Sequence, residues 1–123
     1  MKNDIEKRAD IEMVVNKFYE KVKTDAIIGH FFSEVVKVNW EVHLPRMYDF
    51  WENILFHTGA YTGNPMQRHR QIHLQYSISN EHFTHWVQLF QNTVDELFDG
   101  DNAMLLKNRA SSIAAIMQVK VNL

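Results

Sequence analysis

The sequence predicts an all-helical fold. Apolar residues recur at spacings of three and four along four long segments, as they do on the buried face of a helix. Residue types that start and end helices flank these segments, and no segment shows the apolar–polar alternation of a half-exposed strand. At 123 residues the chain can bury a core of its own, so we expect residues 1–123 to form one domain.

The first half of the chain predicts two long helices. One covers residues 10–24, opens at Asp10 and buries a stripe of Ile11, Val14, Val15, Phe18, Tyr19 and Val22. A shorter helical segment is expected in "HFFSEVV", residues 30–36. The second long helix buries Met47, Phe50, Trp51, Ile54 and Leu55. Asn39 suits its N-cap, but Pro45 would then lie in the interior, so either the regular part begins near His43 or the first turns are irregular.

The second half predicts a loose segment followed by two further helices. Residues 56–78 contain the loop "TGAYTGNP", after which Pro65 suits the first turn of a short helix carrying "MQRHRQIH". The next helix starts at Ser79 or Asn80 and ends at Gly100, and its buried face comprises Phe83, Trp86, Val87, Phe90, Val94, Leu97 and Phe98. Asp101 or Asn102 caps the last helix, whose buried face comprises Leu106, Ala110, Ile113, Ala114, Met117 and Val121.

Composition excludes several classes of function. The chain has no cysteine, which removes disulfides, thiolate metal sites and thiol catalysis. A formal charge of −2 gives no basic excess for binding nucleic acid, and no apolar run is long enough to cross a membrane. A cytoplasmic protein is therefore expected. Eight phenylalanines, four tyrosines and three tryptophans either fill a core or line a pocket for a flat ligand.

His69 and His73 are four residues apart, which on a helix places both imidazoles on one face. A metalloprotease zinc site has a glutamate after the first histidine, but here that residue is Arg70. A zinc site would also need a third ligand, such as His57 or a carboxylate. Serines lie in no recognisable nucleophile motif, and most carboxylates fall on polar helix faces, so the residues indicate no hydrolase.

A haem would also use one of these histidines. It needs a neutral imidazole for the iron, aromatic walls, cations for the propionates and polar groups on the ligand side. His69 or His73 offers the imidazole. Polar groups on or beside apolar faces are Tyr19, His43 and Trp86. Candidate walls are Phe31, Phe32, Met47, Phe50, Trp51, Phe83, Trp86 and Phe90, and candidate cations are Arg46, Arg68 and Arg70.

Six short motifs in order carry a resemblance to a known family. They are "FYEKV" at 18–22, "FF" at 31–32, "WEVHL" at 40–44, "FW" at 50–51, "YTGNPMQRH" at 61–69 and "HFTHWVQLF" at 82–90. Together they resemble the bacterial truncated haemoglobins of group III over almost the whole chain. The glycine-pair motifs of the other two truncated groups are missing, as expected for the third. The resemblance implies a two-over-two helical sandwich around a haem.

The resemblance also implies roles for individual residues. His69, after "NPM", resembles the proximal iron ligand, with His73 as the alternative if the alignment slips. Tyr19, His43 and Trp86 match the distal residues that face a bound ligand. Phe32 resembles the phenylalanine at the haem edge, with Phe31 as the alternative register. Arg46 could reach a propionate, Met47 would face the ligand, and Phe50 and Phe90 would line the haem.

The implied function is reversible binding of O2, CO or NO at a haem b iron. Two distal hydrogen bonds would slow ligand release, which favours NO dioxygenation or peroxide turnover over oxygen transport and implies an electron donor. We expect a monomer or weak dimer. The alternatives are a cofactor-free helical interaction module and a small zinc protein that uses His69 and His73. The distal polar trio favours the globin, because an adaptor has no use for it.

Overall fold

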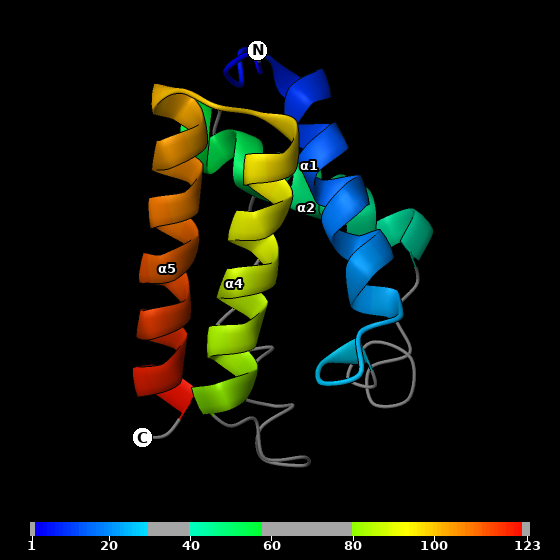
Figure 1. Cartoon of the computed structure of the whole chain (residues 1–123), viewed down its shortest axis with the longest axis vertical. Coiled ribbons are helices and arrows are strands. Elements are labelled where there is room, and N and C mark those ends of the chain that lie inside the picture. The colour runs from blue at the N-terminus through cyan, green and yellow to red at the C-terminus, as the bar shows by residue number, and fades with distance from the viewer. Residues whose placement is uncertain (1, 30–39, 58–79, 122–123) are drawn as a thin grey trace.

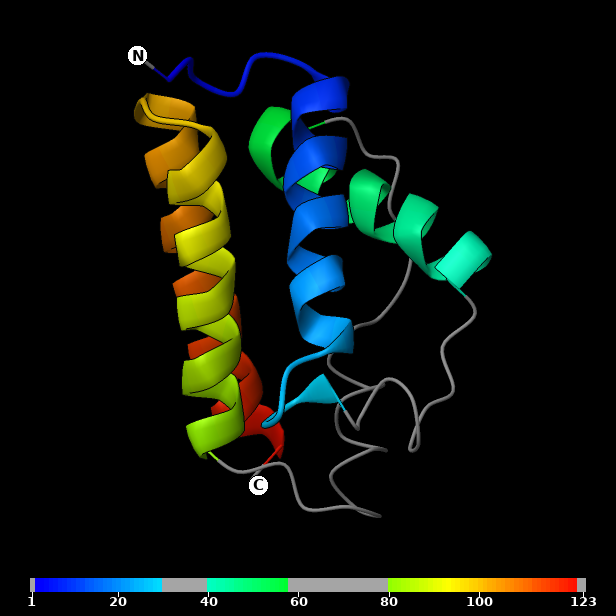
Figure 2. The ribbon, with the colours of Figure 1, turned by 45° about the vertical axis from the view of Figure 1, so that its right-hand side comes forward.

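The computed structural model describes residues 2–29, 40–57 and 80–121, and within these ranges the regular structure is helical. The four long helices are α1 (Arg8–Lys23), α2 (Trp40–Phe56), α4 (Asn80–Leu97) and α5 (Asp101–Val121). α4 and α5 lie side by side, and α1 packs across α2 (Figures 1 and 2). Because α1 also contacts α4 and α2 contacts α5, the two pairs pack on each other. The predicted two-over-two arrangement is confirmed.

Helix α1 begins two residues earlier than predicted. Arg8 is its first residue, so Asp10 lies within the first turn and does not precede it. The Asp10 carboxylate accepts hydrogen bonds from the backbone N–H groups of Glu6, at 2.9 Å, and Lys7, at 3.2 Å. These bonds satisfy donors that a helix start leaves without intrahelical partners. Asp10 therefore does stabilise the start of α1, but from inside the helix.

Helix α2 runs through Pro45 without interruption, from Trp40 to Phe56. Pro45 lies just beyond the first turn, where its missing N–H removes one backbone bond, to the carbonyl of Glu41. Of the two alternatives, a regular part that begins near His43 is therefore wrong, and α2 is already helical over its first turns, from Trp40. Asn39, the expected N-cap, lies outside the described residues, as do the segments expected to be helical at 30–36 and after Pro65.

The predicted starts of α4 and α5 agree with the structure, but α4 ends at Leu97 and not at Gly100, and the cap of α5 differs from the predicted one. Asp4, in the segment before α1, places its carboxylate over the start of α5 and accepts hydrogen bonds from the backbone N–H groups of Asn102 (3.0 Å) and Ala103 (2.9 Å). Asn102 in turn donates its side-chain N–H to the carbonyl of Ile5, at 2.7 Å. The N-terminal segment, rather than Asp101 or Asn102, caps the last helix.

The core lies between the two helix pairs. The whole predicted stripe of α1 is buried, and on α5 Leu106, Ala110 and Ala114 are buried while Ile113 is partly so. The side chains of Met117 and Val121 lie outside the described set. On α2 only Trp51 and Leu55 of the predicted stripe are fully buried. Among the helices of the described ranges, none is both long and apolar enough to span a membrane.

Candidate functional site

Aromatic side chains from α1, α2 and α4 meet in one cluster inside the fold. Phe18 on α1 contacts Trp86 and Phe90 on α4, with ring centroids 5.8 and 5.1 Å apart. Trp51 on α2 stacks on Trp86 at 6.4 Å and lies 4.6 Å from Phe90. On α4, Trp86 and Phe90 are four residues apart, so both lie on the buried face of that helix. The cluster joins three elements that the sequence keeps far apart.

Tyr19 and His43 are brought together at one side of this cluster. Their ring centroids lie 5.2 Å apart with the planes at 84°, and Tyr19 is only 5% exposed. Although His43 is half-buried as a residue, its Nε2 atom is screened from solvent. The Tyr19 ring also contacts Phe18 at 4.9 Å, which links it to Trp86 through one intervening ring. The predicted polar trio therefore lies around a single aromatic cluster.

The remaining predicted site residues fall into two groups. Phe90 is fully buried, Met47 and Phe50 are partly buried against the core, and Arg46 is exposed on α2. An exposed Arg46 keeps its guanidinium in solvent, where a carboxylate at the rim of a pocket could be bound. Phe31, Phe32, Arg68, His69, Arg70 and His73 lie outside the described residues. The predicted iron ligand is one of these.

The structure adds Trp40 to the site. Its ring contacts both Tyr19, at 5.3 Å, and His43, at 5.6 Å, and the Lys23 ammonium lies 4.5 Å from its centroid. The sequence could have indicated this role of Trp40, because a spacing of three places Trp40 and His43 on one face of α2. Trp40 therefore helps to enclose the Tyr19–His43 pair.

A hydrogen bond between α4 and the turn after α1 is a second addition. His85, next to Trp86 in the chain, places Nε2 2.7 Å from a carboxylate oxygen of Asp25. Asp25 also accepts hydrogen bonds from the backbone of Ile27 and Ile28. Burial raises the pKa of the Asp25 carboxyl, but the His85 and backbone hydrogen bonds outweigh this and hold it below its usual value. No sequence pattern connects these two residues.

The described residues do not assemble a metal site of the zinc type. They contain no group of three or more histidine, aspartate and glutamate side chains placed to hold a metal ion. His57, the suggested third zinc ligand, is exposed at the end of α2. It lines an open depression of about 450 Å³ with Asn53, Ile54, Arg109 and Ile113. None of these residues belongs to the aromatic cluster.

Comparison with known proteins decides the family. A family model described as bacterial-like globin matches residues 3–120. The chain belongs to this globin family. The globin is 26% identical over 121 residues to the group 3 truncated hemoglobin of Campylobacter jejuni, a match that covers 96% of this chain and 93% of the relative.

A solved structure supports the same assignment. The crystal structure of group III truncated hemoglobin from Campylobacter jejuni matches this globin with a TM-score of 0.87 and 25% sequence identity, over 98% of this chain and 95% of that chain. The resemblance to group III truncated haemoglobins and the all-helical globin fold are both confirmed. Family membership implies haem binding, which is the function that the sequence favours over a zinc site or a cofactor-free interaction module.

The described part of the site fits a haem. A porphyrin needs apolar, aromatic walls and a ligand side whose few polar groups are shielded from water. The Trp51, Trp86 and Phe90 rings supply such walls, and the buried Tyr19 ring and His43 Nε2 supply shielded polar groups beside them.

Proposed function

We propose that this globin is a truncated haemoglobin that binds haem b through His69 and binds O2, CO or NO on the side lined by Tyr19, His43 and Trp86. The contact between Tyr19 and His43 is the observation that carries the proposal, because it gathers two polar side chains of different helices within a buried aromatic cluster. The name of the Campylobacter jejuni relative, a group 3 truncated hemoglobin, supports the same function.

Each remaining site residue has a proposed role in holding the haem. His69 ligates the iron, and Phe32 packs against the haem edge. Arg46 binds a propionate, a role that its exposed position on α2 allows. Met47, Phe50 and Phe90 are proposed to line the haem, which fits their burial against the aromatic cluster. A bound haem would supply the iron that binds the diatomic ligand.

The distal residues act by donating hydrogen bonds. A Tyr19 hydroxyl and a Trp86 indole N–H directed at a ligand of partial negative charge each contribute about 1–1.5 kcal/mol in a dry pocket. Two such bonds slow ligand release by about a hundredfold, at ~1.4 kcal/mol for each factor of ten. The buried edge of His43 can donate a third bond or block the entrance to the ligand side.

Slow release favours chemistry on the ligand over transport. A carrier must unload its oxygen, whereas NO dioxygenation and peroxide turnover benefit from a ligand that stays in place. Both reactions consume electrons, so we propose a reductase as partner. We further propose a monomer or weak dimer in the cytoplasm, where a chain without cysteines is stable to a reducing environment.

An absorption spectrum tests the haem and its ligand in one experiment. Wild type, His69→Ala and His73→Ala are measured as purified and after dithionite with carbon monoxide. A sharp Soret band that moves with carbon monoxide, is largely lost in His69→Ala and survives in His73→Ala is the expected result. A band that survives in His69→Ala and disappears in His73→Ala would move the ligand to His73.

The same spectra separate the alternatives. If wild type shows no Soret band, even after reconstitution with hemin, the haem function is wrong. A zinc assay on the purified protein then decides between the zinc site at His69 and His73 and a cofactor-free interaction module.

A further inference from the structure

The contact between α1 and α2 is a series of antiparallel pairs. Moving along α1 from its N-terminus, the partners on α2 run from its C-terminal half toward its N-terminus. The pairs are Arg8 with Asp49 and Glu52, Asn16 with Tyr48, Tyr19 with His43, and Lys23 with Trp40. The pair proposed to face the ligand therefore belongs to the same interface as an ion network at the other end of α1.

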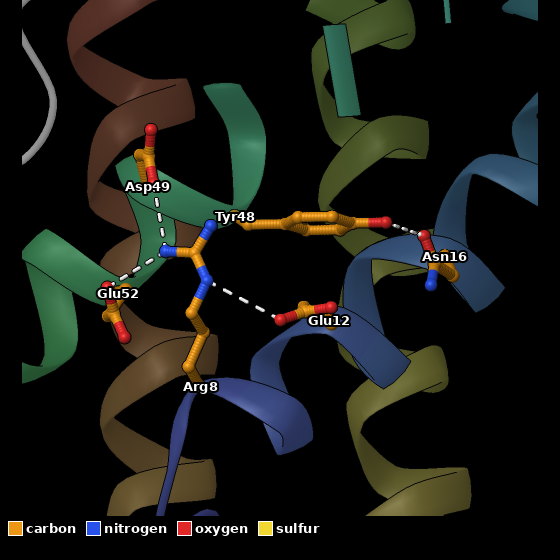
Figure 3. Close-up of polar contacts among 6 residues, drawn as sticks. All are labelled: Arg8, Glu12, Asn16, Tyr48, Asp49 and Glu52. Atoms are coloured by element: carbon orange, nitrogen blue, oxygen red, sulfur yellow. Dashed lines mark hydrogen bonds and ion pairs between the residues drawn. The ribbon is translucent and has the colours of Figure 1, made fainter. Parts of the chain in front are cut away.

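Arg8 is the centre of that network (Figure 3). Its Nη1 atom donates to a carboxylate oxygen of Asp49 at 2.8 Å and to one of Glu52 at 3.0 Å. These carboxylates are three residues apart, so they project from one face of α2. One guanidinium nitrogen thus binds two points on α2.

The neighbouring contacts hold the guanidinium itself in place. The Arg8 Nε atom lies 3.4 Å from a carboxylate oxygen of Glu12, one turn along α1. The guanidinium carbon lies 5.8 Å from the ring centroid of Tyr48, whose hydroxyl donates a hydrogen bond to Asn16. In Figure 3 the Arg8 side chain extends from α1 toward Asp49 and Glu52 on α2. The two helices are therefore joined both by the bonds of Arg8 to Asp49 and Glu52 and by the hydrogen bond between Tyr48 and Asn16.

We propose that Arg8 is a positioning residue for the ligand site, because its bonds to Asp49 and Glu52 set the register of α2 against α1 and with it the placement of His43 relative to Tyr19. A helix rises 1.5 Å per residue. Sliding α2 by one residue would displace His43 by that amount from the Tyr19 ring and would break both bonds of Arg8. The inference rests on the proposed role of Tyr19 and His43 beside the ligand.

Because the Arg8 network is partly exposed, we expect its loss to change the position of α2 on α1 more than the free energy of unfolding. The side chains of Arg8 and Asp49 are 37% and 36% exposed, and that of Glu52 is 17% exposed. Ion pairs in such surroundings contribute little to the free energy of unfolding. Loss of Arg8 should therefore leave the fold intact while the α1–α2 register loosens.

The test compares Arg8→Gln with Lys21→Gln. Lys21 also lies on α1 and forms an ion pair at 2.8 Å, but its partner, Glu96, is on α4, so its loss leaves the α1–α2 contact untouched. NMR of the carbonmonoxy protein measures nuclear Overhauser contacts between the Tyr19 and His43 ring protons. Stopped-flow mixing measures the O2 dissociation rate. The double variant Asp49→Asn/Glu52→Gln removes the same link from α2.

Arg8→Gln and the double variant are both expected to weaken the Tyr19–His43 contact and to raise the O2 dissociation rate about two- to fivefold. In a Tyr19→Phe background Arg8→Gln should change the rate little, because its effect passes through the Tyr19 hydroxyl. Unchanged ring contacts in Arg8→Gln, or an equal change in Lys21→Gln, would overturn the proposal.

The two proposals can fail separately. If the purified protein shows no Soret band, the haem function is wrong. The ring contacts are then measured in the protein as purified, and their response to Arg8→Gln still decides whether Arg8 sets the register.

Discussion

The rings of Tyr19 and His43 contact each other edge to face, with centroids 5.2 Å apart, although one belongs to α1 and the other to α2. Trp40 contacts both rings, and Phe18 contacts Tyr19 from the core side. The phenol and the imidazole are thus held by packing on several sides. Since a packed ring has little freedom to reorient, substitutions that keep the ring and remove only the polar group are the most informative.

Tyr19→Phe removes one hydroxyl and leaves the ring contacts in place. If the hydroxyl donates to the ligand, the O2 dissociation rate rises about tenfold, the equivalent of one hydrogen bond of ~1.4 kcal/mol. Trp86→Phe removes the indole N–H and should act in the same direction. Stopped-flow displacement of O2 by carbon monoxide measures both rates. Unchanged rates in both variants would exclude hydrogen bonding by these two groups.

Asp4→Asn tests the cap of α5. The carboxylate accepts the backbone N–H groups of Asn102 and Ala103, and loss of a cap costs about 0.5–2 kcal/mol of stability. An amide retains one acceptor oxygen, so Asp4→Ala should lose more stability than Asp4→Asn. Urea unfolding measures the change. The control is Asp99→Asn, because the Asp99 carboxylate makes no hydrogen bond to any described residue; equal losses in both would contradict the cap.

Gly100→Ala should destabilise the protein because its new side chain would meet Asp4, the residue that caps α5. Gly100 has φ +143°, which side chains rarely adopt, and an added Cβ would lie 2.5 Å from the Asp4 carboxyl carbon. We expect a loss of about 1–3 kcal/mol from the backbone conformation, plus displacement of Asp4. In an Asp4→Gly background the carboxyl carbon and the Cβ that would lie 2.6 Å away are both gone, so the clash is relieved and Gly100→Ala should cost less. A cost that is the same in both backgrounds would show that only the backbone conformation matters.

Stability should fall in acid because of two carboxyl groups. Burial raises the pKa of Asp4, but hydrogen bonds from the backbone of Asn102, Ala103 and Ile5 outweigh it, and the pKa lies below the usual value, as does that of Asp25. With a lowered folded-state pKa, the unfolded chain binds protons first. The stabilisation is therefore complete above the unfolded pKa, near 4, and is lost as the pH falls through the folded value.

Urea unfolding between about pH 7 and pH 3 checks this dependence. Asp4→Asn and Asp25→Asn should each be less stable than wild type at neutral pH and lose less stability on acidification. Parallel pH curves for wild type and both variants would show that other carboxyl groups cause the acid sensitivity.

The helices could be predicted because their apolar residues repeat with the period of a helix. The stripe from Ile11 to Val22 is buried as expected, and Phe83 and Phe90 on α4 are buried too. The start of α1 was misplaced because Asp10 binds backbone N–H groups from inside the first turn, and sequence does not distinguish that position from the N-cap. Pro45 likewise suggested a start that is too late, because α2 tolerates one missing bond near its start.

The candidate site was predicted from residue type and from resemblance. Tyr19 contacts His43, and Trp86 contacts Phe90, around one aromatic cluster, but their roles beside a ligand remain predictions, as does that of His69. The polar links could not be predicted. Asp25 with His85, Arg8 with Asp49 and Asp4 with Asn102 each join residues far apart in the chain, and single polar residues carry no periodic pattern that would indicate a partner.

The cap on α5 also affects the order in which contacts form as the chain is synthesised and folds. Asp4 is translated early, yet its partners Asn102 and Ala103 follow 98 and 99 residues later. While the ribosome is still adding α4, the Asn102 and Ala103 partners of Asp4 do not yet exist, and the start of α5 must form before Asp4 can cap it. Joining two such distant points is entropically slow. We therefore expect the contact between Asp4 and the start of α5 to form late in folding.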